Sequence, residues 1–585
     1  MAYQSPVADI LFSLYHVAGL GEDIEAGLYG EVDVETVSSV ISEAGRFATD
    51  VIAPLNWTGD QEGARYANGI VTTPKGFREA YKAWAEGGWS SVSASPEYGG
   101  MGLPHSVNFA CGEIWNGASM GFALCPLLTE GAVGALSAHA SPELRKTYLA
   151  RMISGEWTGT MNLTEPQAGS DLNAVKTRAE RAEDGSYRIF GQKIYITYGE
   201  HDFTDNIIHL VLARLPDAPP GTHGISLFLV PKFLVNADGS LGERNDARCA
   251  SIEHKLGIHA SPTCVMIYGD DGGATGFLVG EENRGLAAMF VMMNSARLAV
   301  GQQGVAIAER AYQHALAYAK ERRQGHAASA GAGMSPLIEH PDIQRMLLTM
   351  KSSLQAARGI CHLTGVSIDR SFHARTKDER QAAGERAALL TPVAKAFSTE
   401  IGDEAASLGV QIHGGMGYIE ETGAAQFMRD ARIAAIYEGT NGIQAIDLVT
   451  RKLPLSGGET VFREIAGIKS IASRVAEEGG ADFGATAARL REAAAALEGA
   501  TAYLLKTLAA DPAAALAGAS PYLRLFGLTL GAACLAKAGL ARDEAGRVAL
   551  ARFFAEKILP AAAGLASAVQ SGAIAGAAEA LGDAA

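Results

Sequence analysis

The sequence predicts an α+β multidomain protein in which one β-rich segment separates helical segments. Apolar residues recur at helical spacing before residue 157 and again from residue 285. Between these positions, short runs rich in β-branched and aromatic residues, such as Ile225–Val230, are bounded by turn signals. A chain of 585 residues is also too long for one compact domain, and three or four are expected.

Changes in period and composition divide the chain into five predicted segments. After Pro454 the composition shifts towards Ala and Leu, which predicts an additional packed helical domain at the C-terminal end. The predicted segments are an N-terminal helical extension (1–35), an N-terminal α domain (36–156), a central β domain (157–282), a C-terminal α bundle (283–455) and an extra C-terminal helical domain (456–585).

Capping residues and apolar faces place individual helices. Ser5, followed by a proline, predicts the start of a helix that continues to about residue 20. One long amphipathic helix is predicted over 285–325, with further helices near 341–370 and 385–411. The polar residues 371–384 are expected to form the loop between the last two.

Composition disfavours several classes of protein. The formal net charge of −15 argues against nucleic acid as a partner. No transmembrane segment is expected, since no apolar run approaches the roughly 18 residues that span a bilayer. The N-terminus also lacks the features of a signal peptide. Six scattered cysteines without a C-x-x-C pair fit a reducing compartment and no metal site. We therefore expect a cytoplasmic protein.

The stretch Ile433–Leu448 is the strongest candidate for chemistry. It predicts a helix that breaks at Glu438 and Gly439 and restarts near Thr440, a good N-cap. Apolar runs flank the acidic side chain on both sides. Such surroundings disfavour the charged carboxylate and raise its pKa, which suits a general base near neutral pH. From this stretch alone, a solvated loop glutamate is an equally good interpretation.

Further short motifs follow one another along the chain. They are Met161–Asp171 (MNLTEPQAGSD), Lys193–Gly199 (KIYITYG), Glu253–Gly257 with Ser261–Thr263, Glu321–Gln324, Gln411–Tyr418 and Arg429–Arg432. Together with the α-β-α order, they resemble the motifs of the acyl-CoA dehydrogenase family over about residues 36–450. The order and spacing of the whole set carry this resemblance. It implies a β-barrel-like or sandwich domain in the middle of the chain and a four-helix bundle after it.

The resemblance implies FAD-dependent α,β-dehydrogenation of an acyl-CoA thioester to the trans-2-enoyl-CoA. In this family a base removes the α proton, FAD takes the β hydrogen as hydride, and two donors stabilise the enolate oxygen. Glu438 matches the base, and its backbone N–H matches one donor. Some relatives carry the base directly before the arginine of an R-x-x-x-G pattern. Here that position, before Arg297, is Ala296, which cannot accept a proton.

The other site residues follow from matching motif positions. Those expected to bind FAD are Met161, Leu163, Thr164, Ile196, Thr197, Arg322, Gln324, Gln411, Gly414, Gly415, Thr440 and Gly442. Those expected to contact the acyl-CoA are Ser170, Arg297, Tyr437 and Gly439. Four of these positions match family residues that reach the FAD of a partner subunit: Arg322, Gln411, Gly414 and Gly415. Their chemistry fits this role, because a guanidinium fork suits phosphate and glycine permits close backbone approach. This implies a homodimer.

Three positions depart from the family pattern. Tyr195 stands where tryptophan is usual beside the flavin, and Pro341 stands where a glutamine often contacts FAD. Gly442 stands where a longer polar side chain is common. These departures affect individual cofactor contacts rather than the binding of FAD as a whole.

Both termini resemble the long members of the family, among them the 3-(methylthio)propanoyl-CoA dehydrogenases of dimethylsulfoniopropionate catabolism. The preferred hypothesis is therefore oxidation of 3-(methylthio)propanoyl-CoA to 3-(methylthio)acryloyl-CoA, with electron-transferring flavoprotein as the acceptor. Met289, Met292 and Met293 fit a pocket for a thioether, although a place in the bundle core is the simpler interpretation. The alternatives are a general short-, medium- or long-chain acyl-CoA dehydrogenase of fatty acid β-oxidation, or an acyl-CoA oxidase.

Other enzyme classes have little support. Gly117–Gly121 fits the G-x-S-x-G pattern of hydrolases, but that motif needs a strand before the serine and the flanks here predict helices. No G-x-G-x-x-G follows a predicted strand and no G-K-[ST] occurs. Nicotinamide-dependent and P-loop enzymes are therefore not indicated.

Overall fold

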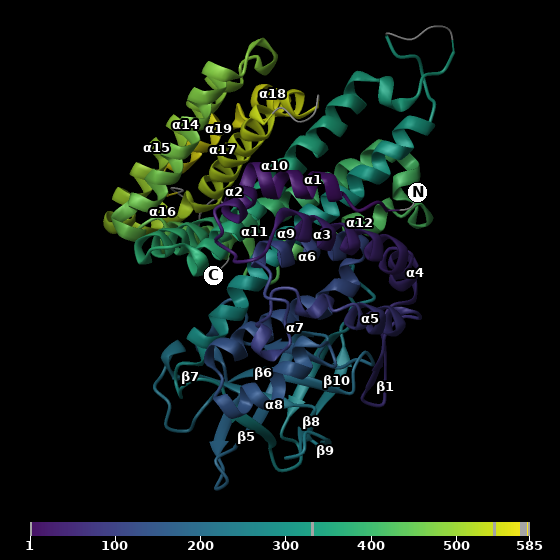
Figure 1. The fold of residues 1–585 in the computed structure, drawn as a ribbon, viewed down its shortest axis with the longest axis vertical. Coiled ribbons are helices and arrows are strands. Elements are labelled where there is room, and N and C mark those ends of the chain that lie inside the picture. Colours follow the sequence, from purple (N-terminus) through teal and green to yellow (C-terminus); the bar gives the residue numbers. More distant parts are fainter. Residues whose placement is uncertain (1–2, 329–332, 542–545, 574–581, 583–585) are drawn as a thin grey trace. The chain divides into compact units, whose positions relative to one another are not determined.

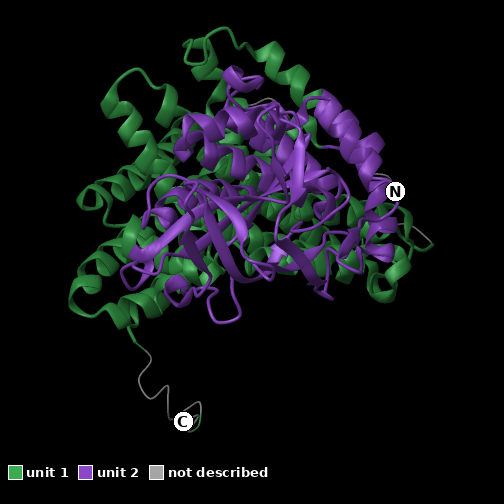
Figure 2. Cartoon of the chain, turned by 90° about the horizontal axis from the view of Figure 1, so that it is seen from below, with its two compact units in different colours: residues 1, 6–42, 300–585 green, residues 2–5, 43–299 purple. Residues whose placement is uncertain are grey.

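The computed structural model describes residues 3–328, 333–541, 546–573 and 582. It forms two compact units, which are coloured separately in Figure 2. Unit 1 contains residues 6–42 and 300–585, and unit 2 contains residues 2–5 and 43–299. The order of elements along the chain confirms the α+β class, with helical regions before and after a central sheet (Figure 1).

The first part of unit 2 is helical. Its elements are η2 (Ala48–Ile52), α4 (Leu55–Glu62), α5 (Phe77–Glu86), α6 (His105–Ala118), α7 (Met120–His139) and α8 (Pro142–Ile153), with a hairpin of β1 (Arg65–Ala67) and β2 (Ile70–Thr72). Ser119, the serine of the G-x-S-x-G pattern, caps α7 by accepting a hydrogen bond of 3.4 Å from the backbone N–H of Phe122. Since α6 precedes it, the serine is not the nucleophile of a strand-to-helix elbow.

An eight-stranded sheet forms the rest of unit 2. Its strands are β3 (Trp157–Asn162), β4 (Arg178–Arg181), β5 (Tyr187–Thr197), β6 (Asn206–Arg214), β7 (Ile225–Pro231), β10 (Ala247–Ile252), β11 (Thr263–Tyr268) and β12 (Ala274–Leu278). Their order is β10-β11-β5-β12-β7-β6-β3, and β4 pairs with both β5 and β6. This extra pairing gives the sheet its barrel-like form. A separate hairpin joins β8 (Phe233–Val235) to β9 (Leu241–Arg244).

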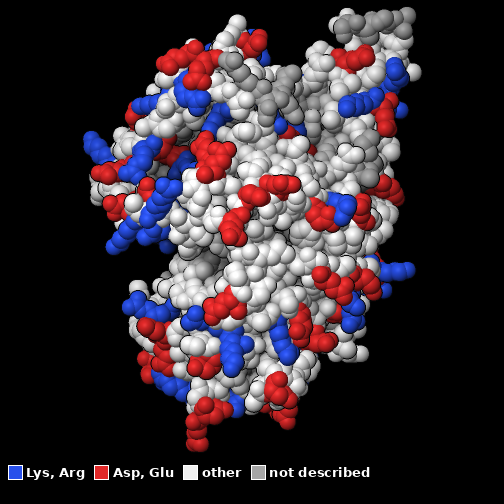
Figure 3. Space-filling model, viewed as in Figure 1, with Lys and Arg blue, Asp and Glu red and all other residues white. Residues whose placement is uncertain are grey.

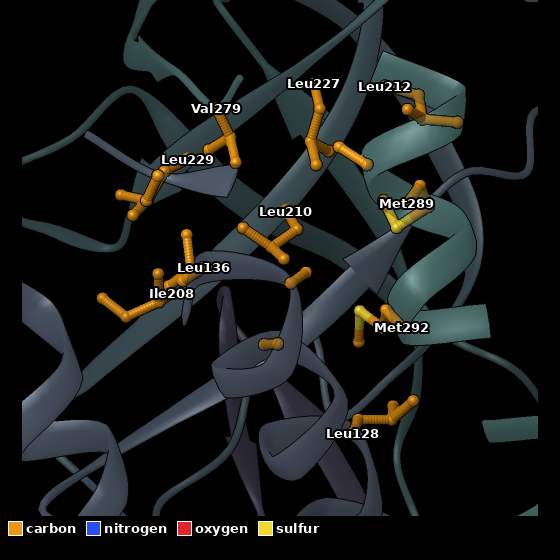
Figure 4. Close-up of a cluster of buried hydrophobic side chains, with 14 of the residues drawn as sticks. Leu128, Leu136, Ile208, Leu210, Leu212, Leu227, Leu229, Val279, Met289 and Met292 are labelled. Carbon is orange, nitrogen blue, oxygen red and sulfur yellow. The ribbon is translucent and has the colours of Figure 1, made fainter. Parts of the chain in front are cut away.

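One apolar core in unit 2 joins the sheet to α7, α8 and the first part of α9 (Gly285–Glu321). In Figure 4, Leu136 of α7 and Leu210 of β6 belong to the same buried cluster as Met289 and Met292 of α9. Both methionines are fully buried, so the simpler interpretation of this methionine-rich helix, a role in the core, is confirmed for these two.

Long helices build the central part of unit 1. They are the remainder of α9, α10 (Pro341–His373) and α11 (Lys377–His413), with the shorter α12 (Ala424–Ala431) and α13 (Asn441–Asp447). The predicted loop 371–384 was wrong in extent, because α10 continues to His373 and α11 already begins at Lys377. Thr376 and Glu379 form a capping box, whose T-x-x-E signature starts the helix within the polar stretch.

The N-terminal segment of unit 1 contains α1 (Val7–Phe12), η1 (Ser13–Ala18) and α2 (Leu20–Glu25), followed by α3 (Val34–Phe47). The expected cap at Ser5 was wrong, since Pro6 occupies the N-cap position without a side-chain cap. The Ser5 hydroxyl donates instead to the carbonyl of Gly45, at 3.0 Å.

Six helices form the C-terminal region of unit 1. They are α14 (Glu459–Glu478), α15 (Thr486–Ala510), α16 (Pro512–Ala517), α17 (Ala519–Leu540), α18 (Arg547–Lys557) and α19 (Ala561–Gln570). α17 packs closely on α11, because a Cβ added to Gly527 would lie 2.4 Å from the ring of Phe397. Arg524 of α17 also forms an ion pair of 3.1 Å with Glu400 of α11. The predicted helix start at Asp543 lies outside the described residues.

Two helices, α7 and α17, are long and apolar enough to cross a membrane. The expectation that no apolar stretch reaches this length was therefore wrong. In the most apolar window of each helix, 78% and 83% of the residues are buried inside the protein, so both are core helices. On the face shown in Figure 3, basic and acidic side chains are interspersed.

The close approach of α9 and α11 generates a prediction on stability. A Cβ added to Gly304 would lie 2.2 Å from the carbonyl oxygen of Ser398, so Gly304→Ala must push the helices apart. We expect the free energy of unfolding to fall by about 1–3 kcal/mol, measured by urea denaturation. Gly564→Ala is the matched control, since its added Cβ meets nothing within 4 Å. An unchanged stability of Gly304→Ala would contradict the tight packing.

Candidate active site

The loop around Glu438 has the predicted break between helices. α12 is followed by the 3-10 turn η10 (Arg432–Ala435), and the chain then takes positive φ angles of 55° at Glu438 and 81° at Gly439. Thr440 starts α13, because its hydroxyl accepts a hydrogen bond of 3.2 Å from the N–H of Ile443. The predicted break and N-cap are therefore confirmed.

Buried side chains hold this loop in place. The amide nitrogen of Gln444 donates to the carbonyl oxygens of Glu438 and Gly439, at 3.2 and 3.3 Å. Lys395, which is fully buried on α11, donates to Oδ1 of Asn441 at 2.9 Å. A positive φ is uncommon for a residue other than glycine, and these contacts stabilise it at Glu438.

Tyr437 lies next to Glu438 and is tied to α9. Its hydroxyl donates to Oε1 of Gln303. Burial raises the pKa of Tyr437 well above its usual range, and the neighbouring Glu438 raises it further. The phenol therefore stays protonated and serves as a fixed donor.

Two sequence motifs of unit 2 meet at one buried ion pair. Nζ of Lys193 on β5 lies 2.8 Å from Oε1 of Glu165, and both side chains are almost completely removed from solvent. The same ammonium group donates to the carbonyl oxygen of Leu163 at 2.9 Å. The N–H of Ile194 donates to the carbonyl oxygen of Thr164, also at 2.9 Å. The loop after β3 is thus fastened along β5.

Glu165 stays ionised in this position. Burial acts to raise the pKa of its carboxyl, but Lys193 and hydrogen bonds from Thr177 and Lys176 outweigh it and lower the pKa to about 2. The hydroxyl of Thr177 donates at 2.6 Å and the backbone N–H of Lys176 at 2.7 Å. The sequence signal for this pair was weak, since the two partners belong to different motifs.

The same region offers hydroxyl groups that fit a polar aromatic ring such as the flavin. The hydroxyls of Thr164 and Thr197 are part-exposed, and neither has a partner among the described residues. Ser261 Oγ is buried and also lacks a protein partner in the described chain. Unsatisfied buried donors are uncommon in native proteins. These hydroxyls therefore suit a bound group that supplies hydrogen-bond acceptors. Ser261 was part of a motif but had no assigned role.

The residues next to Thr164 and Thr197 differ in their exposure to solvent. Ile196 is buried in the sheet, whereas Met161 is only partly buried. Tyr195, the residue that replaces the family's tryptophan, has φ of 60° and exposes 61% of its surface. Its ring is available to solvent in this chain.

The positions expected to bind the nucleotide part of FAD are exposed on unit 1. Arg322 and Gln324 follow α9, and neither side chain has a partner in the described part of the chain. Gln411 is exposed in the last turn of α11, and a Cβ added to Gly414 or Gly415 would meet nothing within 4 Å. The other two positions, Thr440 and Gly442, form the start of α13. Pro341 takes the first turn of α10.

The candidate acyl-CoA contacts are divided between the units. Tyr437 and Gly439 belong to unit 1, whereas Ser170 and Arg297 belong to unit 2. Ser170 is exposed in the loop after β3. Arg297 is buried on α9, where its guanidinium contacts Oδ1 of Asn294 at 3.4 Å. Ala296 beside it is buried and carries no acid.

Comparison with known proteins identifies the family. The N-terminal, middle and C-terminal domain profiles of acyl-CoA dehydrogenases match residues 35–156, 160–271 and 283–453. A fourth profile, described as acetyl-CoA dehydrogenase C-terminal like, matches residues 464–577. The chain belongs to the acyl-CoA dehydrogenase family. It is an FAD-dependent oxidoreductase that acts on an acyl-CoA, and an additional C-terminal domain extends the family's usual three domains.

Similar relatives include 3-methylmercaptopropionyl-CoA dehydrogenase of Ruegeria pomeroyi, at 49% identity over 96% of both chains. Butyryl-CoA dehydrogenase of Syntrophomonas wolfei is 37% identical over 79% of this chain and 77% of its own length. Among solved structures, Caenorhabditis elegans ACDH-11 in complex with C11-CoA has a TM-score of 0.79 at 19% identity. It covers 95% of this chain and 92% of that chain, which confirms the fold including the extra helical domain.

The buried ion pair generates a prediction for the loop after β3. Lys193→Met keeps the length of the side chain but leaves the Glu165 carboxylate buried without its counter-ion. We expect the free energy of unfolding to fall by about 3–5 kcal/mol. FAD content per chain, measured by absorbance after gel filtration, should fall with it, because the Leu163 carbonyl loses its donor.

The double variant Lys193→Met/Glu165→Gln is the control, since it removes both charges and should regain most of the stability. The pKa of Glu165 is lowered from 4.5 to about 2 in the folded protein, so its stabilising effect is complete above pH 4.5 and is lost as the pH falls towards 2. The double variant should lack this part of the pH dependence. Equal stability of the single and double variants would contradict a structural role for the pair.

Proposed function

We propose that this enzyme oxidises 3-(methylthio)propanoyl-CoA to 3-(methylthio)acryloyl-CoA in dimethylsulfoniopropionate catabolism. The observation that carries the proposal is the 49% identity, over 96% of both chains, to the Ruegeria pomeroyi dehydrogenase named for this acyl group. Identity to the butyryl-CoA dehydrogenase of Syntrophomonas wolfei is lower and covers less of the chain. This supports a short, straight acyl group and leaves general fatty acyl-CoA oxidation as the second candidate.

In the proposed mechanism, Glu438 removes the α proton of the thioester. Bound FAD supplies the acceptor for the β hydrogen. The α proton is weakly acidic, so its removal requires donors near the thioester oxygen, and the backbone N–H of Glu438 is proposed as one of them. The contacts of Gln444 with the loop carbonyls hold the base and this donor together. The absence of an acid at Ala296 supports Glu438 as the base.

The remaining residues are proposed to position the two ligands. Thr164 and Thr197 would donate to the flavin ring from unit 2, with Met161, Leu163 and Ile196 beside them. The residues proposed to hold the nucleotide part of FAD are Arg322, Gln324, Gln411, Gly414, Gly415, Thr440 and Gly442. Those proposed to contact the acyl-CoA are Ser170, Arg297, Tyr437 and Gly439. Both threonine side chains are part-exposed, and among the described residues neither hydroxyl has a hydrogen-bond partner, which supports their role.

The role of Glu438 is testable by removing its charge. Glu438→Gln keeps the shape of the side chain, and we expect it to retain FAD while kcat falls by about 100- to 10,000-fold. Turnover would be measured with an artificial electron acceptor. Glu421→Gln, an exposed glutamate on a nearby turn, is the matched control and should keep full activity. Substantial turnover by Glu438→Gln would reject this residue as the base.

The proposed substrate is testable with a series of thioesters. We expect kcat/KM to be highest for 3-(methylthio)propanoyl-CoA. The value for butanoyl-CoA should be lower by about 10- to 200-fold, which is the discrimination that one methylene-sized group in an apolar pocket provides. Propanoyl- to palmitoyl-CoA complete the series. An optimum at long chains would favour general β-oxidation. Parallel assays should show fast reduction of electron-transferring flavoprotein, the proposed acceptor, and hydrogen peroxide as the main product would favour an acyl-CoA oxidase.

We further propose that the enzyme is a cytoplasmic homodimer with the predicted division into segments 1–35, 36–156, 157–282, 283–455 and 456–585. The side chains of Arg322 and Gln411 are exposed and form no hydrogen bond or ion pair with the described residues, which supports a role across a subunit interface. The packing of α17 on α11 supports a C-terminal domain that covers a bundle face.

Light scattering on the FAD-loaded enzyme should give twice the 61.0 kDa mass of the chain. Arg322→Ala should lower the FAD content, because phosphate loses a guanidinium partner. A particle with the mass of a single chain would exclude the dimer, whereas a tetramer would exclude only the covering role of residues 456–585.

A further inference from the structure

A cavity of about 450 Å³ lies within unit 1, apart from every residue proposed above to contact FAD or acyl-CoA. Elements distant in the sequence line it. They are η1 and α2 of the N-terminal segment, α10 and α11 of the bundle, and α14 and α17 of the C-terminal region (Figure 1). A volume of this size is sufficient for a small organic ligand.

The wall of the cavity is mainly apolar. Its apolar side chains include Val17, Leu363, Ile468, Ile471, Leu530 and Ala533. Most of these are buried, whereas Glu22, Arg463 and Gly467 are exposed and mark an opening to solvent. The cavity thus has an apolar interior that a ligand can enter from the solvent.

Most of the charges around the cavity are already paired. Arg386 forms a two-pronged ion pair with Glu464, with hydrogen bonds of 2.7 and 2.9 Å. Arg370 donates to Oδ2 of Asp23 at 2.7 Å. These pairs are satisfied within the protein and supply no net charge.

Two cations of the lining form no direct ion pair among the described residues. Lys537 donates one hydrogen bond, of 2.9 Å, to the carbonyl oxygen of Val17. An ammonium group has three donors, so two of them have no acceptor among the described residues. Arg463 at the opening forms no ion pair there either. Glu22 acts electrostatically on Lys537, and Arg463 acts on Glu385, so these cations are at least partly compensated. What Lys537 offers the cavity is therefore its two unused hydrogen-bond donors.

We propose that this cavity binds a small aliphatic monocarboxylate, with its carboxylate at Lys537 and its alkyl chain against the apolar wall. One ammonium group with two unused donors matches the single carboxylate of such a ligand, whereas it could not neutralise the several phosphate charges of a coenzyme A ester. The ammonium and carboxylate would form a charge-assisted hydrogen bond in a poorly hydrated site, where such bonds are strong. A bound ligand would join η1 to α14 and α17 and stabilise their packing by mass action.

The test uses octanoate and the full-length, FAD-loaded enzyme in titration calorimetry. We expect saturable binding at one site per chain that Gly467→Leu abolishes. Gly467 lies on α14 at the exposed opening of the cavity, and a Cβ added there meets nothing within 4 Å, so a leucine can block the entrance without a clash. Gly564→Leu on α19 is the matched control, since its added Cβ also meets nothing, and it should bind octanoate normally.

The contribution of the charge is tested separately. Lys537→Met should weaken octanoate binding by about tenfold, the loss of one hydrogen bond to a charged group. Methyl octanoate, which lacks the charge, should bind wild type about tenfold more weakly than octanoate. Both glycine variants should keep the acyl-CoA oxidation rate of the wild type, which shows that they fold and that the site differs from the active site.

Three outcomes would overturn the proposal. They are no saturable octanoate binding by the wild type, equal binding by Gly467→Leu and the wild type, or equal affinity for octanoate and its methyl ester. The last would leave an apolar cavity without anion recognition. None of these results depends on which acyl-CoA the enzyme oxidises.

Discussion

The buried ion pair of Lys193 and Glu165 is the interaction on which the proposed flavin-binding surface of unit 2 depends. Neither charge could remain in this interior alone, because desolvation of an unpaired ion costs several kcal/mol. By donating also to the Leu163 carbonyl, Lys193 fixes the backbone next to Thr164. Two motifs separated in the sequence thereby form one surface, and the hydroxyls proposed to meet the flavin project from it.

Much of the fold could be predicted because period and capping are local properties. The switch to short β-rich runs after Trp157 and the return of helical spacing at Gly285 both appear in the structure. The error at 371–384 arose because polar composition was weighed above the T-x-x-E signature at Thr376. The helical regions that contain α7 and α17 were predicted, but the length of their apolar stretches was not. Small and hydroxyl residues interrupt the apolar runs of both helices, so no long uninterrupted run is visible in the sequence. Their high mean hydropathy is explained by their burial inside the fold.

The site could be predicted in part. Thr440 as an N-cap follows from local sequence, and the structure contains it. The positive φ of Glu438 could not be predicted, since it depends on contacts that reach across the fold, such as Lys395 with Asn441. Gln444 gave only a weak signal, as a polar residue among apolar ones, and Ser261 gave none beyond its motif. The assignments of individual residues to FAD and acyl-CoA remain predictions.

The loop proposed to carry the base suggests why an energetically unfavourable backbone is retained. A residue with a side chain in the left-handed region costs about 1–3 kcal/mol, and a typical buried hydrogen bond returns about 1 kcal/mol. The two bonds from Gln444 and the one from Lys395 are therefore of the right size to offset the strain at Glu438. These anchors are buried and belong to the protein itself, so they hold the loop from within the fold. If Glu438 is the base, as proposed, its fixed position avoids reorganisation during proton transfer, which is how positioned groups lower the barrier.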